Sequence, residues 1–308
     1  MNATSPTPHL DALRKDGFVK ITGMLSTQQL QSLRASCEQT TEQARQGKWP
    51  YVRTVPKQYP PWHEWQPEDN IWGVQHLLHP DMAQRNAFAK LYFSDEVLST
   101  VKELVGLKED PYGDDQLVME LFNLLVSPAE RQDFELCWHR DDVRPDVTTE
   151  DEEQQLKEKS PEGKQLHAQY NIALFDDASL VVVPGSHRRI RTDEERNAAP
   201  FEPNMPGQVV VEMKPGDAVF YNSNILHRGV YKGIDTSTNL GRMTLHGSIG
   251  LAGHGSERAR QVSQDAVGQW IGRAQFDLEG SKGERAEAMR QRLVEMGNGE
   301  GLGYSLVG

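Results

Sequence analysis

Hydrophobic residues keep helical spacing near the start of the chain. Leu30, Leu33 and Cys37 recur every three to four residues after Ser26, whose side chain can accept hydrogen bonds from the first turn of a helix. Residues 10–107 are therefore expected to be mainly helical. Within them, patterns of this kind predict a short strand over 18–21 and a helical stretch over 82–105, which Gly106 ends.

From residue 116 the pattern changes to short runs of valine, isoleucine, leucine and phenylalanine separated by turn residues. Such runs predict strands over residues 116–126, 134–138, 169–175, 180–183, 208–213, 218–221 and 242–250. Pro-Gly-Ser-His at 184–187 and Lys-Pro-Gly-Asp at 214–217 predict turns. Helical spacing returns at the end of the chain and predicts helices over 256–273 and 283–296.

This order of elements favours a mainly β fold with flanking helices, built as an antiparallel barrel or sandwich. Strands and helices do not alternate regularly, and no Gly-x-Gly-x-x-Gly turn occurs. Both absences argue against a doubly wound parallel sheet. We expect one domain over residues 10–308, with its core strands at about 116–250.

Two segments fit neither pattern. Residues 49–72 crowd tryptophans and tyrosines among prolines, so they predict neither a regular helix nor a central strand. They form either a wall over a substrate pocket or a plug at the edge of the core. Residues 142–162 are almost wholly polar and predict a solvated surface loop or, alternatively, a mobile cover over a site. We expect both segments to lie where substrate identity is decided.

The composition is that of a soluble acidic protein. The 308 residues are 37% hydrophobic and 25% charged, with a net charge of −12. Without a basic surplus, binding to nucleic acid or to an anionic membrane is not expected. No apolar run approaches the length of about twenty residues that spans a bilayer, and the first residues lack a signal pattern. Cys37 and Cys137 indicate free thiols and a cytoplasmic location.

Candidate chemistry concentrates at the sequence Cys-Trp-His-Arg-Asp, which contains His139 and Asp141. Residues separated by one position on an extended segment point to the same face, so both side chains can reach one point. If a distant strand brings His227 there, the three side chains form the two-histidine, one-carboxylate arrangement that suits non-haem Fe(II) and leaves coordination positions open. Two alternatives remain: histidines that only satisfy hydrogen bonds, and a zinc hydrolase with the same ligands.

Arg242, on the last predicted strand, extends this pattern. Iron held by two imidazoles and a carboxylate keeps positions for a bidentate 2-oxoacid and for dioxygen. An arginine is then needed at the far end of the oxoacid, where its fixed fork can pair with a carboxylate. Thr244 follows at period two on the same face and could add a hydroxyl contact. An ordinary surface ion pair is the alternative for Arg242.

In this order, the motifs resemble the phytanoyl-CoA dioxygenase family of Fe(II)- and 2-oxoglutarate-dependent oxygenases. The matching stretches are His139-Arg140-Asp141, residues 180–187, residues 216–220 followed by His227, and Arg242. Asp-Gly-Phe-Val at 16–19 is similar to the start of the family's N-terminal strand and helix. The resemblance therefore spans residues 10–250.

The resemblance implies a double-stranded β-helix, the cupin-like jelly-roll barrel. It implies that 2-oxoglutarate and dioxygen become succinate and carbon dioxide while a substrate is oxidised. His139, Asp141 and His227 would be the catalytic iron ligands, and Arg242 would bind the distal carboxylate of 2-oxoglutarate. Gln169 matches a position that often contacts this cosubstrate.

Two positions refine the comparison. Asp141 argues for oxygenation, because halogenating relatives have a small residue there. Gly229 departs from the family, in which the second residue after the distal histidine is often a serine that contacts the cosubstrate. The expected function is hydroxylation of a small organic molecule, with secondary metabolism as one candidate setting. Desaturation and ring formation use the same residues and stay open.

A phytanoyl-CoA substrate is not expected. The chain ends in Ser-Leu-Val-Gly rather than a peroxisomal Ser-Lys-Leu, and its acidic composition gives no basic groove for coenzyme A. The alternative to an enzyme is a jelly-roll module that binds a ligand or partner and keeps a vestigial metal site. The residues do not indicate the substrate, its stereochemistry or the oligomeric state.

Overall fold

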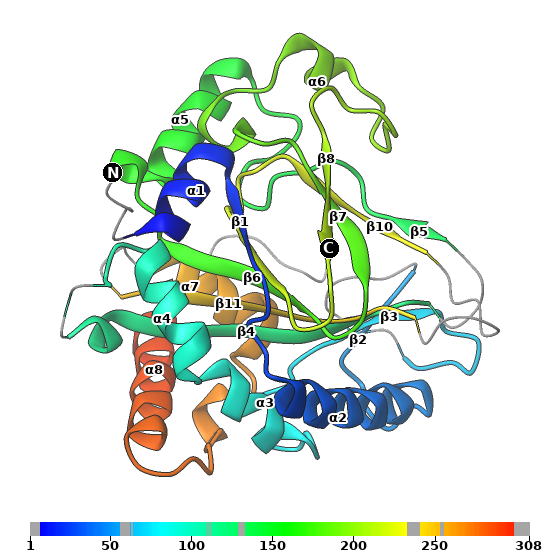
Figure 1. The fold of residues 1–308 in the computed structure, drawn as a ribbon, viewed down its shortest axis with the longest axis vertical. Helices are drawn as coiled ribbons and strands as arrows, with labels where there is room; N and C mark the ends of the chain where they lie inside the picture. The colour runs from blue at the N-terminus through cyan, green and yellow to red at the C-terminus, as the bar shows by residue number, and fades with distance from the viewer. Residues whose placement is uncertain are drawn as a thin grey trace.

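The strands form two antiparallel sheets that face each other (Figure 1). The computed structural model describes residues 7–55, 62, 64–108, 110, 112–128, 133–232, 241–252 and 256–298. One sheet has seven strands in the order β1-β9-β6-β11-β4-β3-β2, and the other has four in the order β5-β10-β7-β8. The strands are β1 (Phe18–Ile21), β2 (Val52–Thr54), β3 (Ile71–Val74), β4 (Leu117–Val126), β5 (Phe134–Glu135), β6 (His167–Ala173), β7 (Asp177–Val182), β8 (Val209–Met213), β9 (Ala218–Tyr221), β10 (His227–Tyr231) and β11 (Met243–Leu251).

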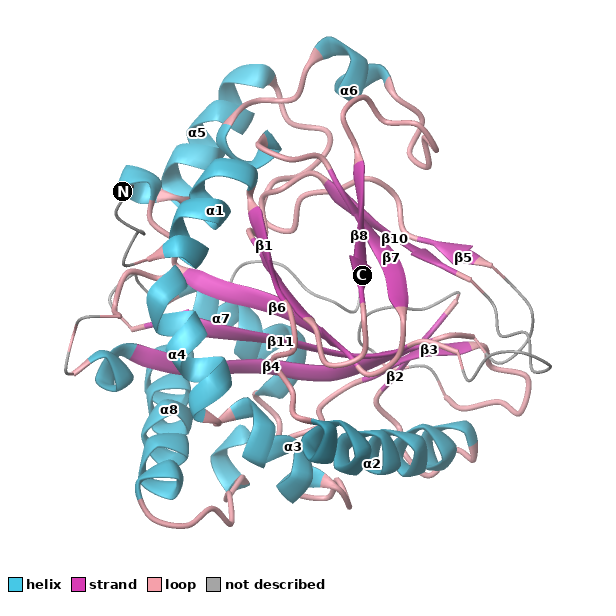
Figure 2. Ribbon diagram, viewed as in Figure 1, coloured by secondary structure: helices cyan, strands magenta, loops and turns pink. Residues whose placement is uncertain are grey.

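Most helices lie outside the seven-stranded sheet, on the side away from the smaller sheet (Figure 2). They are α1 (Pro8–Asp16), α2 (Thr27–Arg45), α3 (Arg85–Tyr92), α4 (Asp95–Leu104), α5 (Thr149–Lys159), α6 (Asp193–Asn197), α7 (Glu257–Val262) and α8 (Ser281–Gly297). In this view α1, α5 and α6 are instead drawn above the seven-stranded sheet, and α6 lies at the end of β8. No helix in the described ranges is long and apolar enough to cross a membrane.

Local capping explains where the predicted N-terminal helices begin. Ser26 accepts a hydrogen bond from the backbone N–H of Gln29, and the Gln29 side chain accepts one from the backbone of Ser26. Ser94 caps α4 by accepting a hydrogen bond from the backbone N–H of Val97. Gly106 follows α4 with φ 81°, a left-handed conformation that favours glycine. These contacts confirm the expected helices in this part of the chain.

The core lies on both faces of β4. Phe122 points toward the helices and contacts the rings of Phe88 and Tyr92, with centroids 6.4 and 5.3 Å away. Leu121 and Leu125 line the cavity between the sheets. Because helices cover one face and the second sheet covers the other, β4 is hydrophobic along nearly its whole length. The predicted strand over 116–126 is confirmed, and the arrangement is the expected jelly roll.

Two expectations about local structure are wrong, and one strand was not predicted. Residues 49–72 were expected to hold no interior strand, yet β3 begins at Ile71 and pairs with both β2 and β4. Residues 256–273 do not form one helix, because a wide turn over Ser263–Val267 follows α7, and Gly268 donates to the Ser263 carbonyl. Strand β10 was not predicted, since its sequence His-Arg-Gly-Val-Tyr lacks an apolar alternation. Residues 56–61 and 63 lie outside the described ranges.

Candidate metal centre

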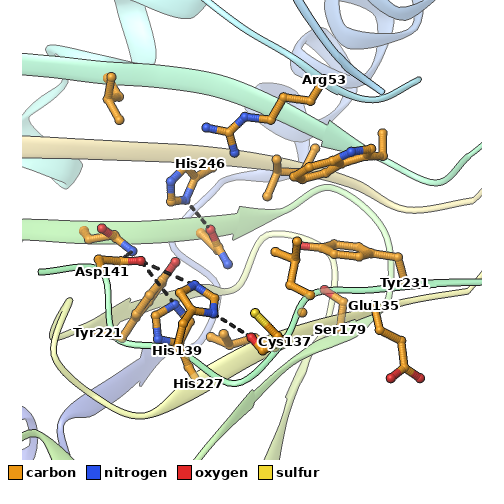
Figure 3. Close-up of a pocket in the computed structure, with 18 of the residues that line it drawn as sticks. Arg53, Glu135, Cys137, His139, Asp141, Ser179, Tyr221, His227, Tyr231 and His246 are labelled. Atoms are coloured by element: carbon orange, nitrogen blue, oxygen red, sulfur yellow. Dashed lines mark hydrogen bonds and ion pairs between the residues drawn. The ribbon is translucent and has the colours of Figure 1, made fainter. Parts of the chain in front are cut away.

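His139, Asp141 and His227 converge in the cavity between the two sheets (Figure 3). One ligand atom from each side chain lies within 4.8 Å of the others. The Nε2 atoms of His139 and His227 are 3.5 and 3.7 Å from Oδ1 of Asp141. The structure therefore brings together the three residues that the sequence predicted as iron ligands.

Backbone pairing fixes this convergence. The backbone N–H groups of His139 and His227 each donate to the carbonyl of the other residue, at 3.0 Å. The N–H of Asp141 donates to the Ser223 carbonyl at 2.8 Å. Regular strand β5 ends at Glu135, so a single bridge to the start of β10, rather than a continuous strand, positions the His-x-Asp segment.

The two histidine rings are oriented by backbone carbonyls. Nδ1 of His139 lies 2.7 Å from the Cys137 carbonyl oxygen, and Nδ1 of His227 lies 2.8 Å from that of Ile225. A carbonyl can only accept, so Nδ1 must carry the proton in both rings. In the neutral imidazole the Nε2 lone pair is then free and is directed toward Asp141, which is the tautomer a metal requires.

Electrostatics favour the ligand-competent forms of Asp141 and His227. Burial acts to raise the pKa of the Asp141 carboxyl, but His227 and His139 outweigh it and hold that pKa far below its usual range. Burial, followed by the neighbouring His139, lowers the pKa of His227 to about 4. For His139, burial lowers the pKa, but hydrogen bonding to Asp141 and its charge more than offset this and raise it. At neutral pH the site therefore contains an ionised carboxylate beside a neutral His227.

Gln169 holds the second oxygen of the candidate carboxylate ligand. Its Nε2 donates to Oδ2 of Asp141 at 2.9 Å, which leaves Oδ1 directed at the two histidines. Gln169 lies on β6, directly opposite Tyr221 on β9. Its expected contact with the cosubstrate stays a prediction, because here its amide is bonded to Asp141.

Arg242 lies in the same cavity beside a buried carboxylate. Its Nε donates to Oδ2 of Asp177 at 2.8 Å, and Thr244 also donates to this oxygen. Burial lowers the pKa of Arg242, but Asp177 outweighs it and the net shift is upward. Arg242 is thus a buried, charged residue and not part of a surface ion pair. The Thr244 hydroxyl is fully buried against Asp177 and Arg242, and its direct contact with the cosubstrate stays a prediction.

The expected loop over the acidic segment 142–162 is wrong, because the segment contains a helix, whereas a role as a cover over the site stays a prediction. The centre of the segment is α5, and Glu152 on that helix is completely buried. The Glu152 carboxylate accepts hydrogen bonds from Arg140, Arg191 and Arg196. The segment folds because one helix face supplies a counter-charge to buried guanidinium groups.

Arg140 links this helix to the candidate ligands, since it stands between His139 and Asp141 in the sequence. Its guanidinium also donates to the carbonyls of Ser186, at 2.9 Å, and of Asn224. The residue is 6% exposed. The ligand segment is therefore held from behind by α5 and by the loop that precedes β10.

The cavity has a volume of about 710 Å³, and aromatic side chains form part of its wall. Trp62 and Trp72 from the aromatic segment line it, as do Tyr221 and Tyr231 from β9 and β10. Trp49 instead packs in the main core and donates to the Gln75 carbonyl. The aromatic segment therefore fills both expected roles, with some rings in the cavity wall and others in the core.

Three residues with direct contacts at this site were not found from the sequence. Asp177 pairs with Arg242, Glu152 pairs with Arg140, and the Tyr231 ring lies 4.6 Å from the Arg242 guanidinium carbon. Asp177 follows a second aspartate between two predicted strands, and Glu152 lies in a run of acidic residues. Neither pattern distinguishes a buried carboxylate from exposed neighbours of the same type.

Comparison with known proteins places these residues in a family context. A family model described as phytanoyl-CoA dioxygenase (PhyH) matches residues 13–230. The match includes His139, Asp141 and His227, and it ends before Arg242. The sequence matches none of the curated proteins with which it was compared.

Solved structures share the fold at low sequence identity. EctD from S. alaskensis, solved with 2-oxoglutarate and 5-hydroxyectoine, has a TM-score of 0.55 at 16% identity, covering 82% of this chain and 78% of its own. HygX from Streptomyces hygroscopicus, solved with nickel, 2-oxoglutarate and hygromycin B, has a TM-score of 0.52 at 18% identity, covering 79% and 86%. AviO1 from Streptomyces viridochromogenes has a TM-score of 0.53 at 18% identity, covering 81% and 96%.

Proposed function

The chain belongs to the phytanoyl-CoA dioxygenase family of Fe(II)- and 2-oxoglutarate-dependent oxygenases, and we propose that it hydroxylates a small organic molecule in its inter-sheet cavity. The enzyme class follows from the family: a 2-oxoglutarate-dependent dioxygenase that uses Fe(II), 2-oxoglutarate and dioxygen. The observation that carries the proposal is the convergence of two Nε2 atoms and one carboxylate oxygen within 4.8 Å.

His139, Asp141 and His227 are proposed to hold the iron. The donor set fits, because each Nδ1 lies against a backbone carbonyl and so directs Nε2 toward Asp141, whose carboxylate is ionised. A two-histidine, one-carboxylate set leaves open positions, so bound iron supplies coordination for the 2-oxoacid and activation of dioxygen. Gln169 keeps one Asp141 oxygen in place and thereby orients the other toward the metal position.

Arg242 is proposed to bind the distal carboxylate of 2-oxoglutarate. Its Nη1 atom is buried without a hydrogen-bond partner in the described part of the chain, although the residue lines the cavity. A buried guanidinium N–H without a partner loses its hydration, so a carboxylate there gains a strong charge-assisted bond. Asp177 holds the Nε edge and leaves the other edge of the guanidinium for a ligand.

The substrate is proposed to be a polar small molecule, and secondary metabolism is a candidate setting. A cavity of about 710 Å³ is within the size range of small-molecule sites and exceeds the needs of 2-oxoglutarate alone. The amides of Gln75 and Gln261 and the imidazole of His246 line it beside Trp62. EctD and HygX, which share the fold, were solved with such polar molecules.

Residues 10–308 are proposed to form a single oxygenase domain. Helix α8, near the C-terminus, packs on β4, and Arg292 on α8 donates to the Leu117 carbonyl at 2.6 Å. Arg258 on α7 lines the cavity and pairs with the buried Glu120. The C-terminal helices therefore support the core strands and the cavity directly.

Succinate formation across a panel of amino acids, alkaloids, terpenoids and acyl thioesters tests the proposal. We expect one class to stimulate succinate release that requires both Fe(II) and 2-oxoglutarate. The Asp141→Ala variant should lose this activity. Hydrolytic activity that needs zinc, with no succinate from any class, would contradict the oxygenase assignment.

A further inference from the structure

Two polar atoms at the Arg242 end of the cavity have no hydrogen-bond partner in the described part of the chain. They are Nη1 of Arg242 and Oγ of Ser179, and both atoms are buried. Both residues line the cavity. Buried polar groups are normally satisfied, so a convergent pair of unsatisfied groups in a cavity wall indicates the place of a polar ligand.

A shared carboxylate places these two residues together. Asp177 accepts a hydrogen bond from Nε of Arg242 at 2.8 Å and, through its other oxygen, from the backbone N–H of Ser179 at 2.8 Å. The register between β7 and β8 shifts between Asp177 and Leu180, so Ser179 lies at an irregular point of its strand. Such irregularities redirect a side chain, here into the cavity.

Tyr231 forms the third part of this group. Its ring lies 4.6 Å from the Arg242 guanidinium carbon, and Figure 3 shows it extending from β10 into the pocket toward His139, Asp141 and His227. The residue is 5% exposed and lines the cavity. A phenol beside a guanidinium can donate a hydrogen bond to an anion that the guanidinium attracts.

Gly229 makes room for this ring. A Cβ atom at position 229 would lie 2.6 Å from both Cε2 and Cζ of Tyr231, closer than real side chains approach. The absence of a side chain at Gly229 is therefore a condition for the Tyr231 position. The glycine that departs from the family's usual serine is explained by the aromatic residue that lies over it.

We propose that Tyr231 and Ser179 complete, together with Arg242, the binding site for the distal carboxylate of 2-oxoglutarate. This inference rests on the proposed function. In this chain two hydroxyls, from β10 and β7, take the place of a hydroxyl at position 229. They make the site selective for a 2-oxoacid that ends in a carboxylate over one that ends in a methyl group.

Calorimetric titration of the Fe(II)-loaded protein without oxygen tests this with a matched ligand pair. 2-Oxoglutarate and 2-oxopentanoate share the metal-binding end and chain length, and only the first has a distal carboxylate. Tyr231→Phe and Ser179→Ala should each raise the Kd for 2-oxoglutarate about tenfold, or about 1.4 kcal/mol, the range of a hydrogen bond to a charged group. The Kd for 2-oxopentanoate should stay within about twofold.

Tyr112→Phe is the control, because Tyr112 is 72% exposed and away from the cavity lining. It should leave both dissociation constants unchanged. Equal weakening of the two ligands by Tyr231→Phe would mean that the ring only packs, and this would overturn the inference. Unchanged 2-oxoglutarate binding in both variants would overturn it as well, while the proposed function would stand. A wild-type protein that binds neither ligand would instead defeat the proposed function.

The role of Gly229 is tested by a double-mutant cycle. Gly229→Ala should displace the Tyr231 ring and raise the Kd for 2-oxoglutarate about tenfold or more. In a Tyr231→Ala background the same substitution should change that Kd by less than about twofold, because no ring remains to be displaced. Equal losses in both backgrounds would show that Gly229 acts independently of Tyr231 and would overturn this step.

Discussion

Nε of Arg242 lies 2.8 Å from Oδ2 of Asp177, and both side chains are buried. This contact connects the start of β11 to β7 and fixes one edge of the guanidinium. Burial raises the pKa of the Asp177 carboxyl, but Arg242 and nearby hydroxyl and N–H donors outweigh it, and the net pKa is lowered. The Arg242 guanidinium and the Asp177 carboxylate are therefore both ionised at neutral pH.

Replacing Asp177 by asparagine should leave Arg242 as an uncompensated buried charge. We expect a loss of about 3–5 kcal/mol in the free energy of unfolding. Added 2-oxoglutarate should raise the Tm of the Fe(II)-loaded variant more than that of wild type, because its carboxylate then supplies the missing counter-charge. Asp176→Asn is the control, since Asp176 is exposed and pairs with the exposed Lys214. Similar behaviour of the two variants would contradict the role given to Asp177.

Two adjacent glutamates on α5 should respond differently to the same substitution. Glu152 is completely buried among arginines, whereas Glu153 forms an exposed pair with Lys157. Glu152→Gln should lower the free energy of unfolding by about 3–5 kcal/mol, and Glu153→Gln by less than about 0.5 kcal/mol. Urea unfolding measures both. Equal, small effects would show that α5 does not anchor Arg140.

Gln169→Leu should weaken iron binding without removing a ligand. The substitution deletes the 2.9 Å hydrogen bond to Asp141 and frees that carboxylate to rotate. Loss of such a supporting contact typically reduces metal affinity about 10–100-fold. Gln154→Leu, on the exposed face of α5, is the matched control. The measurement is anaerobic calorimetry with Fe(II). An unchanged affinity for iron would contradict the proposed role of Gln169 in orienting Asp141.

Buried His76 should make the metal-free protein less stable in acid. Burial, then His79 and Arg53, lower the pKa of His76 from 6.5 to about 3. As the pH falls, the His76 imidazole is therefore protonated in the unfolded chain before it is protonated in the folded protein. The stabilisation that neutral His76 gives the folded state is complete above pH 6.5 and is lost as the pH falls toward 3. One such group contributes a slope of about 1.4 kcal/mol per pH unit within that window.

His76→Asn is the variant for this test, because His76 has φ 62° and asparagine tolerates that conformation. Urea unfolding between pH 7 and pH 4.5 should give a shallower pH dependence for the variant than for wild type. Parallel profiles would mean that His76 does not titrate on unfolding as its burial requires.

Much of the fold and of the candidate metal centre was predictable, because the sequence patterns that indicate them are local. Ser26 and Gln29 form a capping box within one helical turn, and a period of two puts His139 and Asp141 on one side of an extended segment. The spacing to His227 and Arg242 follows the order of the family's motifs. Each of these features needs only a short stretch of sequence or a known order of stretches.

The features that were not predicted depend on contacts between distant segments. Asp177 and Arg242 are separated by 65 positions, and sequence alone gives no sign that one neutralises the other. Helix α5 was missed because its first turns read as an acidic, solvated run, although Thr148 caps it through the N–H of Asp151. The ring of Tyr231 over Gly229 likewise becomes visible only in three dimensions.

The most direct test of the central claim is the visible absorption of the protein with Fe(II) and 2-oxoglutarate under anaerobic conditions. We predict a weak charge-transfer band in the blue-green that requires both components, because the 2-oxoacid then chelates an iron held by His139, Asp141 and His227. Asp141→Ala should abolish the band. Its absence from the intact protein at saturating Fe(II) and 2-oxoglutarate would contradict the assignment of an iron- and 2-oxoglutarate-dependent oxygenase.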